Sequence, residues 1–565
     1  MRLMLKRRVG LYVSTLLLLI ASLGHSQTTY YIDATNGNNA SPGTSPAQAW
    51  QSVTKVANQT FQAGDAILLK CGESWEETLE IKNTSNGNAQ APITIADYGE
   101  GSLPVIQKLV IRGDYIVARD LVIEHNKTSG NAVALRSTKN CVLHDLTVRN
   151  GLGNGIDADE ADGLRIHSCL VHHFLAGSTT VQVDAHGIVL TRTRNVTVRN
   201  TEVHHVSGDS FQADPARGET NDLRFKNCHF WTGPLSEDFN EGWLAGDIPG
   251  ENAVDTKASR NRERMRLTFQ NITAHGWTSD AAGTAVPAAF NMKENIDAVF
   301  DGVTVYDCHV AFRIRNDADG NADTTLMNAL VYDCDDAIRA EDNLQNLKVY
   351  NSTFGKSFHK HLLFAPSGAK AGLPTWDLRN NAFYLSKPLE ASDTSNKRAQ
   401  DRDFLDVAQA NYKPKPKSKL VDSGVTIPEV AVDRDSMNRP QGVGYDIGAY
   451  ELPNVASNAL NRVDEQVALE DGLLQNYPNP FNPETWMPFE LATDAEVTIT
   501  IYDTQGSKVR TIDLGFQPAG VYRTKAQAGF WDGRNGDGEH VASGVYFYQM
   551  QAGDYTATRK MLIMK

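Results

Sequence analysis

The chain has few cysteines, and none has the spacing of a metal site. Its 565 residues include six cysteines, and no pair shows the CxxC or Cys/His pattern of a structural zinc centre. Five of them lie within a repeated strand pattern: Cys141, Cys169, Cys228, Cys308 and Cys334. We therefore expect buried free thiols rather than disulfides.

An excess of positive charge is also missing. The chain has 54 basic and 68 acidic residues, a net charge of −14 at pH 7. Nucleic acids and anionic membrane surfaces are bound through clustered lysine and arginine. The composition therefore argues against both as partners, and a polyanionic ligand would need a local basic patch or a bridging cation.

Long apolar runs are absent beyond the N-terminus. Val9 to Leu23 is apolar, follows Lys6, Arg7 and Arg8, and is short for a bilayer span. This pattern predicts a secretory signal peptide over residues 1–27, with a membrane anchor as the alternative. We expect a secreted or cell-surface protein without membrane insertion.

The sequence does contain a repeat. Segments such as Val142–Val148, Leu164–Val171 and Val196–Val203 each read as two short alternating strands joined by a polar corner. The corner recurs at intervals of roughly 23 to 32 residues, with some longer insertions, which is typical of a solenoid coil. We expect one all-β domain over residues 28–454, closed at its start by an N-terminal cap.

A further strand in each coil carries the candidate site. The pattern x-[Gly/Ala/Ser]-apolar-x-apolar-x occurs at 131–136, 154–159, 186–191, 209–214, 252–257, 288–293, 310–315 and 336–341. Alternation sends the apolar residues inward and the others outward, and coils lie about 4.8 Å apart. Asp214, Lys257, Lys293 and Arg315 should then form a ladder whose charge changes from negative to positive. We interpret this face as a groove for a charged chain, with a face held only by cross-strand ion pairs as the alternative.

This organisation resembles the pectate-lyase-like right-handed parallel β-helix proteins, which include lyases of pectate, alginate and chondroitin. The resemblance rests on the coil pattern, the strand Asp65–Leu69 and the segment Ala91–Ile95. It implies β-elimination, in which a lysine or arginine removes the C5 proton of a uronic acid while Ca²⁺ or basic groups neutralise its carboxylate. The segment Glu251–Lys257 is the nearest match to a strand bearing an acid and a base, although the lysine register of pectate lyases is not reproduced.

Roles follow for individual residues. A lysine base must lose its proton, and neighbouring positive charge lowers its pKa, which points to Lys257 or Lys293 beside the arginines. Acids near Lys257 oppose that lowering. The predicted catalytic residues are Lys257, Lys293 and Arg315; the predicted substrate contacts are His186, Asn291, Arg313 and Trp243; and the predicted calcium ligands are Asp209, Asp214 and Asp255.

Several alternatives stay open at this point. Paired carboxylates among Asp157, Asp209, Asp214 and Asp255 would instead suit a glycoside hydrolase, and a non-catalytic adhesin would only bind glycan. Trp231 and Trp243 can stack on sugar rings or pin their loop to the coil. The histidines that follow the second strand of their coils are interpreted as stacked corner residues, with a metal cluster as the alternative: His172, His173, His204, His205 and His275.

The last part of the chain has a different sequence pattern. The segments Asn476–Pro483, Val497–Tyr502, Trp531–Gly536 and Gly544–Tyr548 alternate and are bounded by turns, which predicts a small β-sandwich over residues 473–565 after a linker at 455–472. These motifs resemble the C-terminal sorting domain of type IX-secreted bacterial proteins and its flagellar hook-cap Ig-like relatives. The resemblance implies a delivery or anchoring module that engages outer-membrane secretion machinery.

Overall fold

The computed structural model describes residues 27–453 and 471–563. Short gaps fall within these ranges, at 215–216, 258–262, 294, 318–319, 343, 345, 357–359, 365–375, 387–394, 480, 482, 494, 518–519, 524–526, 536–539 and 554. The predicted signal peptide and linker lie almost entirely outside the described residues. The chain divides into two compact units, residues 1–453 and 454–565, and each is described by itself.

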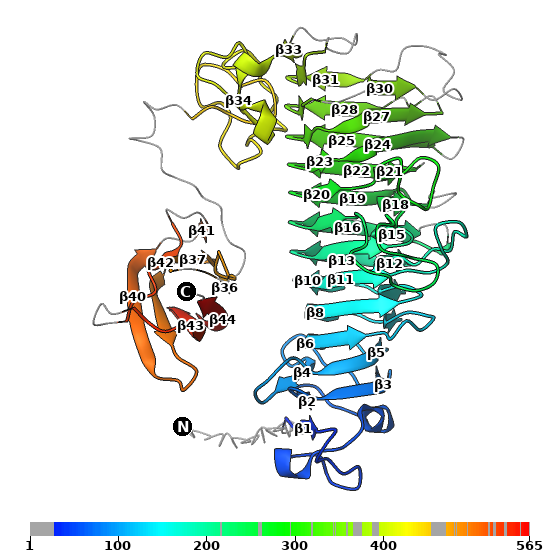
Figure 1. Ribbon diagram of the computed structural model, residues 1–565, viewed down its shortest axis with the longest axis vertical. Coiled ribbons are helices and arrows are strands. Elements are labelled where there is room, and N and C mark those ends of the chain that lie inside the picture. Colours follow the sequence, from blue (N-terminus) through cyan, green and yellow to red (C-terminus); the bar gives the residue numbers. More distant parts are fainter. Residues whose placement is uncertain are drawn as a thin grey trace, which may run out of the picture. The chain divides into compact units, whose positions relative to one another are not determined.

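The first unit is a right-handed parallel β-helix, as predicted (Figure 1). Its strands form three stacked columns in which each strand pairs in parallel with the equivalent strand of the next coil. The site column contains β3 (Ser74–Ile81), β5 (Val105–Ile111), β7 (Val133–Arg136), β9 (Ile156–Asp159), β12 (Ile188–Thr191), β15 (Phe211–Asp214), β18 (Asn252–Thr256), β21 (Ala288–Met292), β24 (Cys308–Asp317), β27 (Cys334–Glu341) and β30 (Lys360–Phe364). The middle column contains β1 (Thr29–Ile32), β2 (Ala66–Lys70), β4 (Ile93–Tyr98), β6 (Ile116–Glu124), β8 (Val142–Gly151), β10 (Arg165–His167), β13 (Arg194–Arg199), β16 (Asn221–Lys226), β19 (Met265–Gln270), β22 (Ile296–Asp301), β25 (Gly320–Met327), β28 (Leu347–Tyr350) and β31 (Asp377–Arg379). The ring column contains β11 (Leu170–Phe174), β14 (Glu202–Val206), β17 (His229–Trp231), β20 (Thr273–His275), β23 (Thr304–Tyr306), β26 (Leu330–Val331), β29 (Thr353–Phe354), β32 (Ala382–Tyr384) and β33 (Lys397–Ala399).

The polar corners of the repeat are left-handed turns. Asp145, Asn200, Asn227 and Asn271 have φ angles of 49°, 50°, 53° and 52°. Asparagine and aspartate tolerate this conformation better than other non-glycine residues, which explains why they recur there. The corner amides also bond between coils, since Asn271 Nδ2 donates to Asn227 Oδ1 at 2.8 Å.

The interior of the β-helix is a continuous apolar core. Phenylalanines stack along its axis, with Phe225 and Phe269 at 4.9 Å and Phe269 and Phe300 at 4.7 Å between ring centroids. All six cysteines are buried free thiols, as the sequence predicts. Burial raises the pKa of Cys141 to about 11, so this thiol is protonated and inert at neutral pH.

Short non-repeating elements lie at both ends of the β-helix. At the N-terminal end, η1 (Pro46–Gln48) and η2 (Val53–Asn58) flank the buried Trp50, and the cap expected in this region stays a prediction. Near residue 400 lie η4 (Asp401–Asp403), β34 (Phe404–Asp406), η5 (Val407–Gln409) and β35 (Asn411–Pro414). No helix in the described residues has the length and apolar character needed to cross a membrane.

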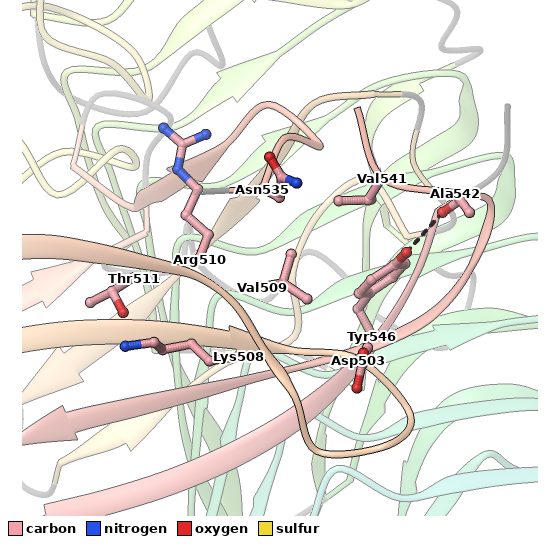
Figure 2. A pocket seen from close by; sticks show the side chains of 9 residues that line it. All are labelled: Asp503, Lys508, Val509, Arg510, Thr511, Asn535, Val541, Ala542 and Tyr546. Atoms are coloured by element: carbon pink, nitrogen blue, oxygen red, sulfur yellow. Dashed lines mark hydrogen bonds between the residues drawn. The ribbon is translucent and has the colours of Figure 1, made fainter. Parts of the chain in front are cut away.

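The second unit is a small β-sandwich of antiparallel sheets, also as predicted. It contains β36 (Gly472–Leu473), β37 (Thr485–Met487), β38 (Phe489–Leu491), β39 (Ala495–Tyr502), β40 (Lys508–Gln517), β41 (Gly520–Tyr522), β42 (Gly529–Trp531), β43 (Gly544–Ala552) and β44 (Tyr555–Ile563). The sheets enclose a separate core around Trp531, Met487 and Tyr548. A pocket of about 610 Å³ opens beside β40, where the Tyr546 hydroxyl donates to the carbonyl of Ala542 at 3.1 Å (Figure 2).

Candidate functional site

The site column aligns the residues that the sequence pattern places together. Ile156 pairs with Ile188, Ile188 with Phe211 and Phe211 with Val254, and the register continues through Phe290, Phe312 and Ile338. The predicted stacking of these strands is therefore confirmed. Gln212, Asp255, Asn291 and Arg313 consequently follow one another on the outward side.

Asp255 is the centre of the candidate site. Its Oδ2 accepts an ammonium N–H from Lys257 at 2.6 Å and another from Lys293 at 2.9 Å. The Asp255 side chain is only 2% exposed, whereas Lys257 is 35% and Lys293 17% exposed. Because two positive charges meet one buried carboxylate, the cluster is a fixed, partly covered patch of net positive charge.

A second buried acid, Asp209, lies beside this cluster. Its Oδ1 accepts the side-chain amide of Asn252 at 2.8 Å, and its backbone N–H donates to His186 Nδ1 at 2.8 Å. Burial, followed by the negative charges of Asp255 and Glu251, raises the pKa of Asp209 well above its usual range. This shift favours the protonated form of Asp209.

His186 is held as a neutral imidazole. Its Nε2 lies 2.7 Å from the side-chain nitrogen of Gln212, and its Nδ1 accepts from the backbone of Asp209. Burial is the main reason that the pKa of His186 falls to about 4. The predicted contact residue is thus present in the site, but it supports Asp209 and Gln212 rather than standing open to solvent.

Glu251 is a residue whose role the sequence pattern did not reveal. It precedes β18, is partly exposed, and accepts a short hydrogen bond from Gln182 on the loop between β11 and β12. Burial and the negative charge of Asp184 raise the pKa of Glu251 to about 7. Asp184 is exposed on the same loop, so two carboxyl groups share the rim of the site. The loop lies outside the repeat, and no periodicity in the sequence signals its position.

The predicted lowering of the lysine pKa is wrong for Lys257. Burial does act in that direction, but the charge and hydrogen bond of Asp255, with Asp209 and Glu251 beyond it, outweigh burial and raise the pKa of Lys257. Lys257 therefore stays protonated at neutral pH. The arginines that were expected to lower it are occupied elsewhere.

In the upper part of the ladder, arginines form ion pairs with a carboxylate and do not make a purely basic surface. Arg313 donates two hydrogen bonds to Glu341, at 3.0 and 3.1 Å, and Arg339 donates to the same carboxylate at 2.6 Å. Arg315 lies opposite Glu341 in the register. Arg313 and Arg339 thus meet a carboxylate in the upper part of the ladder, so the acids are not confined to its lower part as predicted. Asn291 lies between Asp255 and Arg313 and is almost fully buried.

Below the cluster, the same column forms a charged pocket. Arg192 bonds both carboxylate oxygens of Asp159, at 2.8 and 2.6 Å, and Arg136 pairs with Asp157 at 2.7 Å. Arg217 at its edge pairs with Asp214 at 3.0 Å. The pocket has a volume of about 450 Å³ and is lined by Arg136, Asp157, Asp159, Thr191, Arg192 and Arg217.

Trp243 does not line the site. Its side chain is buried, its indole N–H donates to the carbonyl of Ala176 at 2.9 Å, and it packs with Leu175, Leu235 and Phe239. The prediction that Trp243 contacts substrate is wrong, because the side chain is buried and holds the insertion onto the coil. This is the second of the two roles considered for it.

The three predicted calcium ligands are not gathered into one ligand set. Asp255 receives two lysines, Asp209 lies among amide and imidazole groups, and Asp214 pairs with Arg217. Among the described residues, one group of three side chains has ligand atoms close enough to share an ion, and it consists of histidines on the ring column. Calcium binding by the aspartates stays a prediction.

Comparisons with known proteins match separate parts of the chain. Lacto-N-biosidase of Bifidobacterium longum subsp. longum is 29% identical over 219 residues, which is 35% of this chain and 13% of that protein. Alpha-1,3-galactosidase A of Akkermansia muciniphila is 32% identical over 66 residues, 12% of this chain and 11% of that protein. The chain thus matches only about an eighth of the length of these relatives.

A solved structure and a family model complete the comparison. The crystal structure of pectate lyase Pel9A is similar over 76% of this chain and 98% of its own, with 14% identity and a TM-score of 0.40. Residues 481–555 match the family of FlgD Ig-like domains. The C-terminal sandwich is thereby identified as an Ig-like domain.

Proposed function

We propose that the β-helix is a glycan-cleaving enzyme and that it hydrolyses glycosidic bonds with Glu251 as the general acid. The observation that carries this proposal is the partly exposed carboxyl group of Glu251, with a pKa of about 7, beside the exposed carboxylate of Asp184. A pair of carboxyl groups, one acting as acid and the other as base, is the usual equipment for glycoside hydrolysis.

The chemistry requires one proton donor and one base. Glu251 donates its proton to the glycosidic oxygen as the bond from that oxygen to the anomeric carbon breaks. A carboxylate on the opposite side, for which Asp184 is the candidate, takes a proton from the attacking water. Water supplies the hydroxyl of the new reducing end, so atoms and charge balance.

The buried groups form a rigid floor beneath this pair. Asp255 fixes the ammonium groups of Lys257 and Lys293, which present hydrogen-bond donors toward the site. Such preorganised donors favour the negative charge that develops on a leaving oxygen. The charged pocket around Arg192 and Asp159 offers donors and acceptors for further sugar hydroxyls along the same column.

The names of the two curated relatives are consistent with hydrolysis, because both denote glycosidases. They lead us to propose oligosaccharides that carry lacto-N-biose or α-1,3-linked galactose as first test substrates.

β-Elimination of a uronate-containing polysaccharide is the second candidate. Lys257, which is partly exposed, would neutralise the carboxylate of a uronic acid. The raised pKa of Lys257 disfavours it as the base, which leaves Lys293 for that role.

Incubation with a panel of neutral oligosaccharides and uronate polysaccharides, with and without a chelator, tests the proposal. New reducing ends without ultraviolet absorbance indicate hydrolysis, whereas an absorbing unsaturated sugar indicates a lyase. Binding without either product would point to an adhesin. The chelator arm tests the predicted calcium.

Delivery outside the cell by the C-terminal Ig-like domain is a further part of the proposal. Its support is the resemblance of residues 476–565 to type IX sorting domains and the apolar N-terminal segment. Fractionation of a producing cell, with and without residues 473–565, tests it: retention inside the cell is expected only for the shortened chain.

A further inference from the structure

Two pairs of histidines lie at equivalent positions in consecutive coils of the ring column. His172 and His173 lie within the last residues of β11, and His204 and His205 within those of β14, with His172 opposite His204 in the register. His173 and His205 have left-handed backbones, with φ angles of 57° and 48°. The bend at these residues brings neighbouring rings in each pair together on the outside of the coil.

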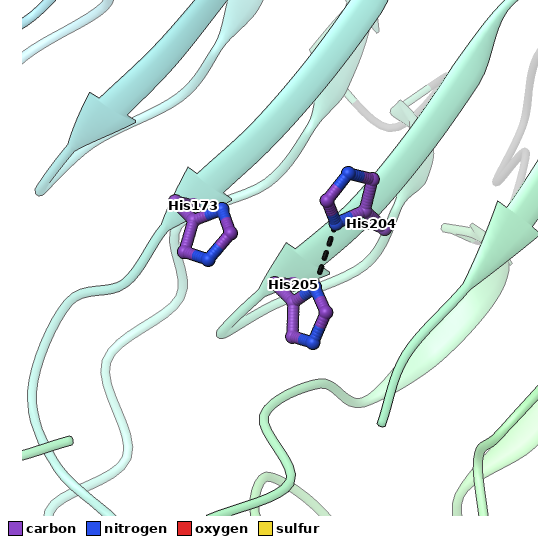
Figure 3. A group of neighbouring side chains, drawn as sticks. All are labelled: His173, His204 and His205. Carbon is purple, nitrogen blue, oxygen red and sulfur yellow. Dashed lines mark hydrogen bonds between the residues drawn. The ribbon is translucent and has the colours of Figure 1, made fainter. Parts of the chain in front are cut away.

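The four rings form a compact block. His172 Nδ1 lies 2.6 Å from His173 Nδ1, and His204 Nδ1 lies 2.6 Å from His205 Nδ1. Between coils, the rings of His172 and His204 stack at 4.9 Å, and those of His173 and His205 at 5.0 Å. Figure 3 shows His173, His204 and His205 gathered at the C-terminal ends of their strands.

The imidazoles in this block are neutral. Burial lowers the pKa of His204 to about 2 and that of His205 to about 4, and it also lowers the pKa of His173. Imidazole nitrogens are common ligands of divalent transition-metal ions.

We propose that His173, His204 and His205 bind one divalent transition-metal ion of the Zn²⁺, Cu²⁺ or Ni²⁺ type. One ring nitrogen from each residue lies within 4.8 Å of the other two. Nitrogens around a tetrahedral ion with metal–nitrogen bonds of 2.0–2.1 Å are roughly 3.4 Å apart, so small ring rotations close the site. Imidazole is a ligand that suits these ions and not calcium.

The environment of His205 supports a ligand in this place. The residue is 6% exposed, and its Nε2 makes no hydrogen bond of normal geometry within the described part of the chain. The carbonyls of Gly233 and Pro234 are near this ring and partly offset the fall in its pKa. A buried nitrogen without a proper partner is costly unless something else binds it.

The charges around the block are balanced enough to accept a cation. Glu237 on the insertion places a negative charge near His173, whereas Arg149 places a positive one. The Arg149 guanidinium bonds Glu124 at 2.7 Å, which offsets its charge. Phe239 of the same insertion approaches His173 with 6.3 Å between ring centroids, so a bound ion would connect two coils close to the insertion.

Equilibrium dialysis of the metal-stripped full chain against Zn²⁺, with the metal counted by mass spectrometry, tests this site. One bound ion per chain is expected, and His205→Ala and His173→Ala should each weaken binding at least about tenfold. His275→Ala is the matched control, because His275 stacks in the same column on Trp231 and Tyr306 but lies outside the group. It should leave binding unchanged.

Electron paramagnetic resonance of the wild-type Cu²⁺ complex keeps the test decisive if an alanine variant does not fold. Coupling to several imidazole nitrogens is expected. The proposal is overturned if the wild-type chain binds no ion saturably, if the spectrum shows only oxygen ligands, or if His275→Ala loses the ion as completely as His205→Ala.

Discussion

The site column and the ring column of the same β-helix use one geometry in two ways. In the ring column, similar side chains repeat at one register position, so His172, His204 and Trp231 stack face to face. In the site column, the residues at one position differ from coil to coil, so Asp255 meets Lys293 across a coil boundary. At a coil spacing of about 4.8 Å, like aromatic side chains stack on one another. Unlike charged side chains form ion pairs between coils and shift the pKa values of neighbouring acids.

The two columns also respond to protons in opposite directions. Burial lowers the pKa of the ring-column histidines, whereas burial and nearby carboxylates raise the pKa of Glu251 and Asp209. Both effects come from removing water from charged groups. The sign differs because the charged form of histidine is the protonated one and the charged form of a carboxyl group is the deprotonated one.

The largest expected effect follows from Glu251→Gln. Removal of a general acid should lower kcat by about 10² to 10⁴-fold on the substrate identified by the panel. In the wild type, activity should fall as pH rises through about 7, since the protonated form of Glu251 is the active one. The variant should lose this alkaline limb. Glu160→Gln is the control, because Glu160 is an exposed partner of Arg192, and equal losses in the two variants would refute the assignment.

A smaller effect on stability separates a buried from an exposed ion pair in the site column. Asp255→Ala leaves two ammonium groups without their shared carboxylate and should lower the free energy of unfolding by on the order of 3 kcal/mol, the low end for a buried pair because Lys257 is partly exposed. Asp157→Ala, which breaks the more exposed pair with Arg136, should cost less than about 1 kcal/mol. Urea unfolding measures both. A similar loss of unfolding free energy in the two variants would mean that Asp255 stabilises the fold no more than an exposed ion-pair partner does.

The opposite proton linkages predict opposite slopes of stability against pH. The folded pKa of His205, about 4, lies below its unfolded value of about 6.5, so its contribution to stability is lost as pH falls from 6.5 toward 4. The folded pKa of Glu251, about 7, lies above its unfolded value, so its contribution is lost as pH rises from about 4.5 to 7. His205→Gln should reduce the loss of stability as the pH falls from 6.5 toward 4. Glu251→Gln should reduce the gain of stability as the pH falls from 7 to about 4.5. Unfolding curves between pH 4 and 8 would contradict this if neither variant changed its slope.

The smallest effect is expected from the Ig-like domain. A chain that ends at Pro453 keeps the whole β-helix core, and the second unit has a core of its own. Specific activity should stay within about twofold of the full chain. A large loss would show that the sandwich contributes to catalysis and not only to the proposed delivery.

The fold could be predicted from the sequence because its signal repeats. The corners at Asp145, Asn200 and Asn227 all have the left-handed backbone that their residue types favour. The inward strand residues stack in the expected register, and the cysteines are buried. A repeat averages over many coils, so one irregular coil does not obscure it.

The site was harder to predict because it depends on single neighbours. Asp184 and Gln182 reach Glu251 from a loop with no periodicity, and the buried position of Trp243 depends on how the insertion folds back. The sequence did show that acids near Lys257 oppose a lowering of its pKa, but only the contact with Asp255 shows that they outweigh burial. Such effects depend on distances between particular atoms, and a repeat pattern does not give them.

Cleavage in water labelled with ¹⁸O tests the central claim most directly. If carboxyl groups of the Glu251 site hydrolyse the glycosidic bond, each cleavage should place one ¹⁸O atom on the new reducing end, and Glu251→Gln should abolish the labelled product. An unsaturated product that carries no ¹⁸O would contradict the account and assign the chemistry to a lysine-based lyase.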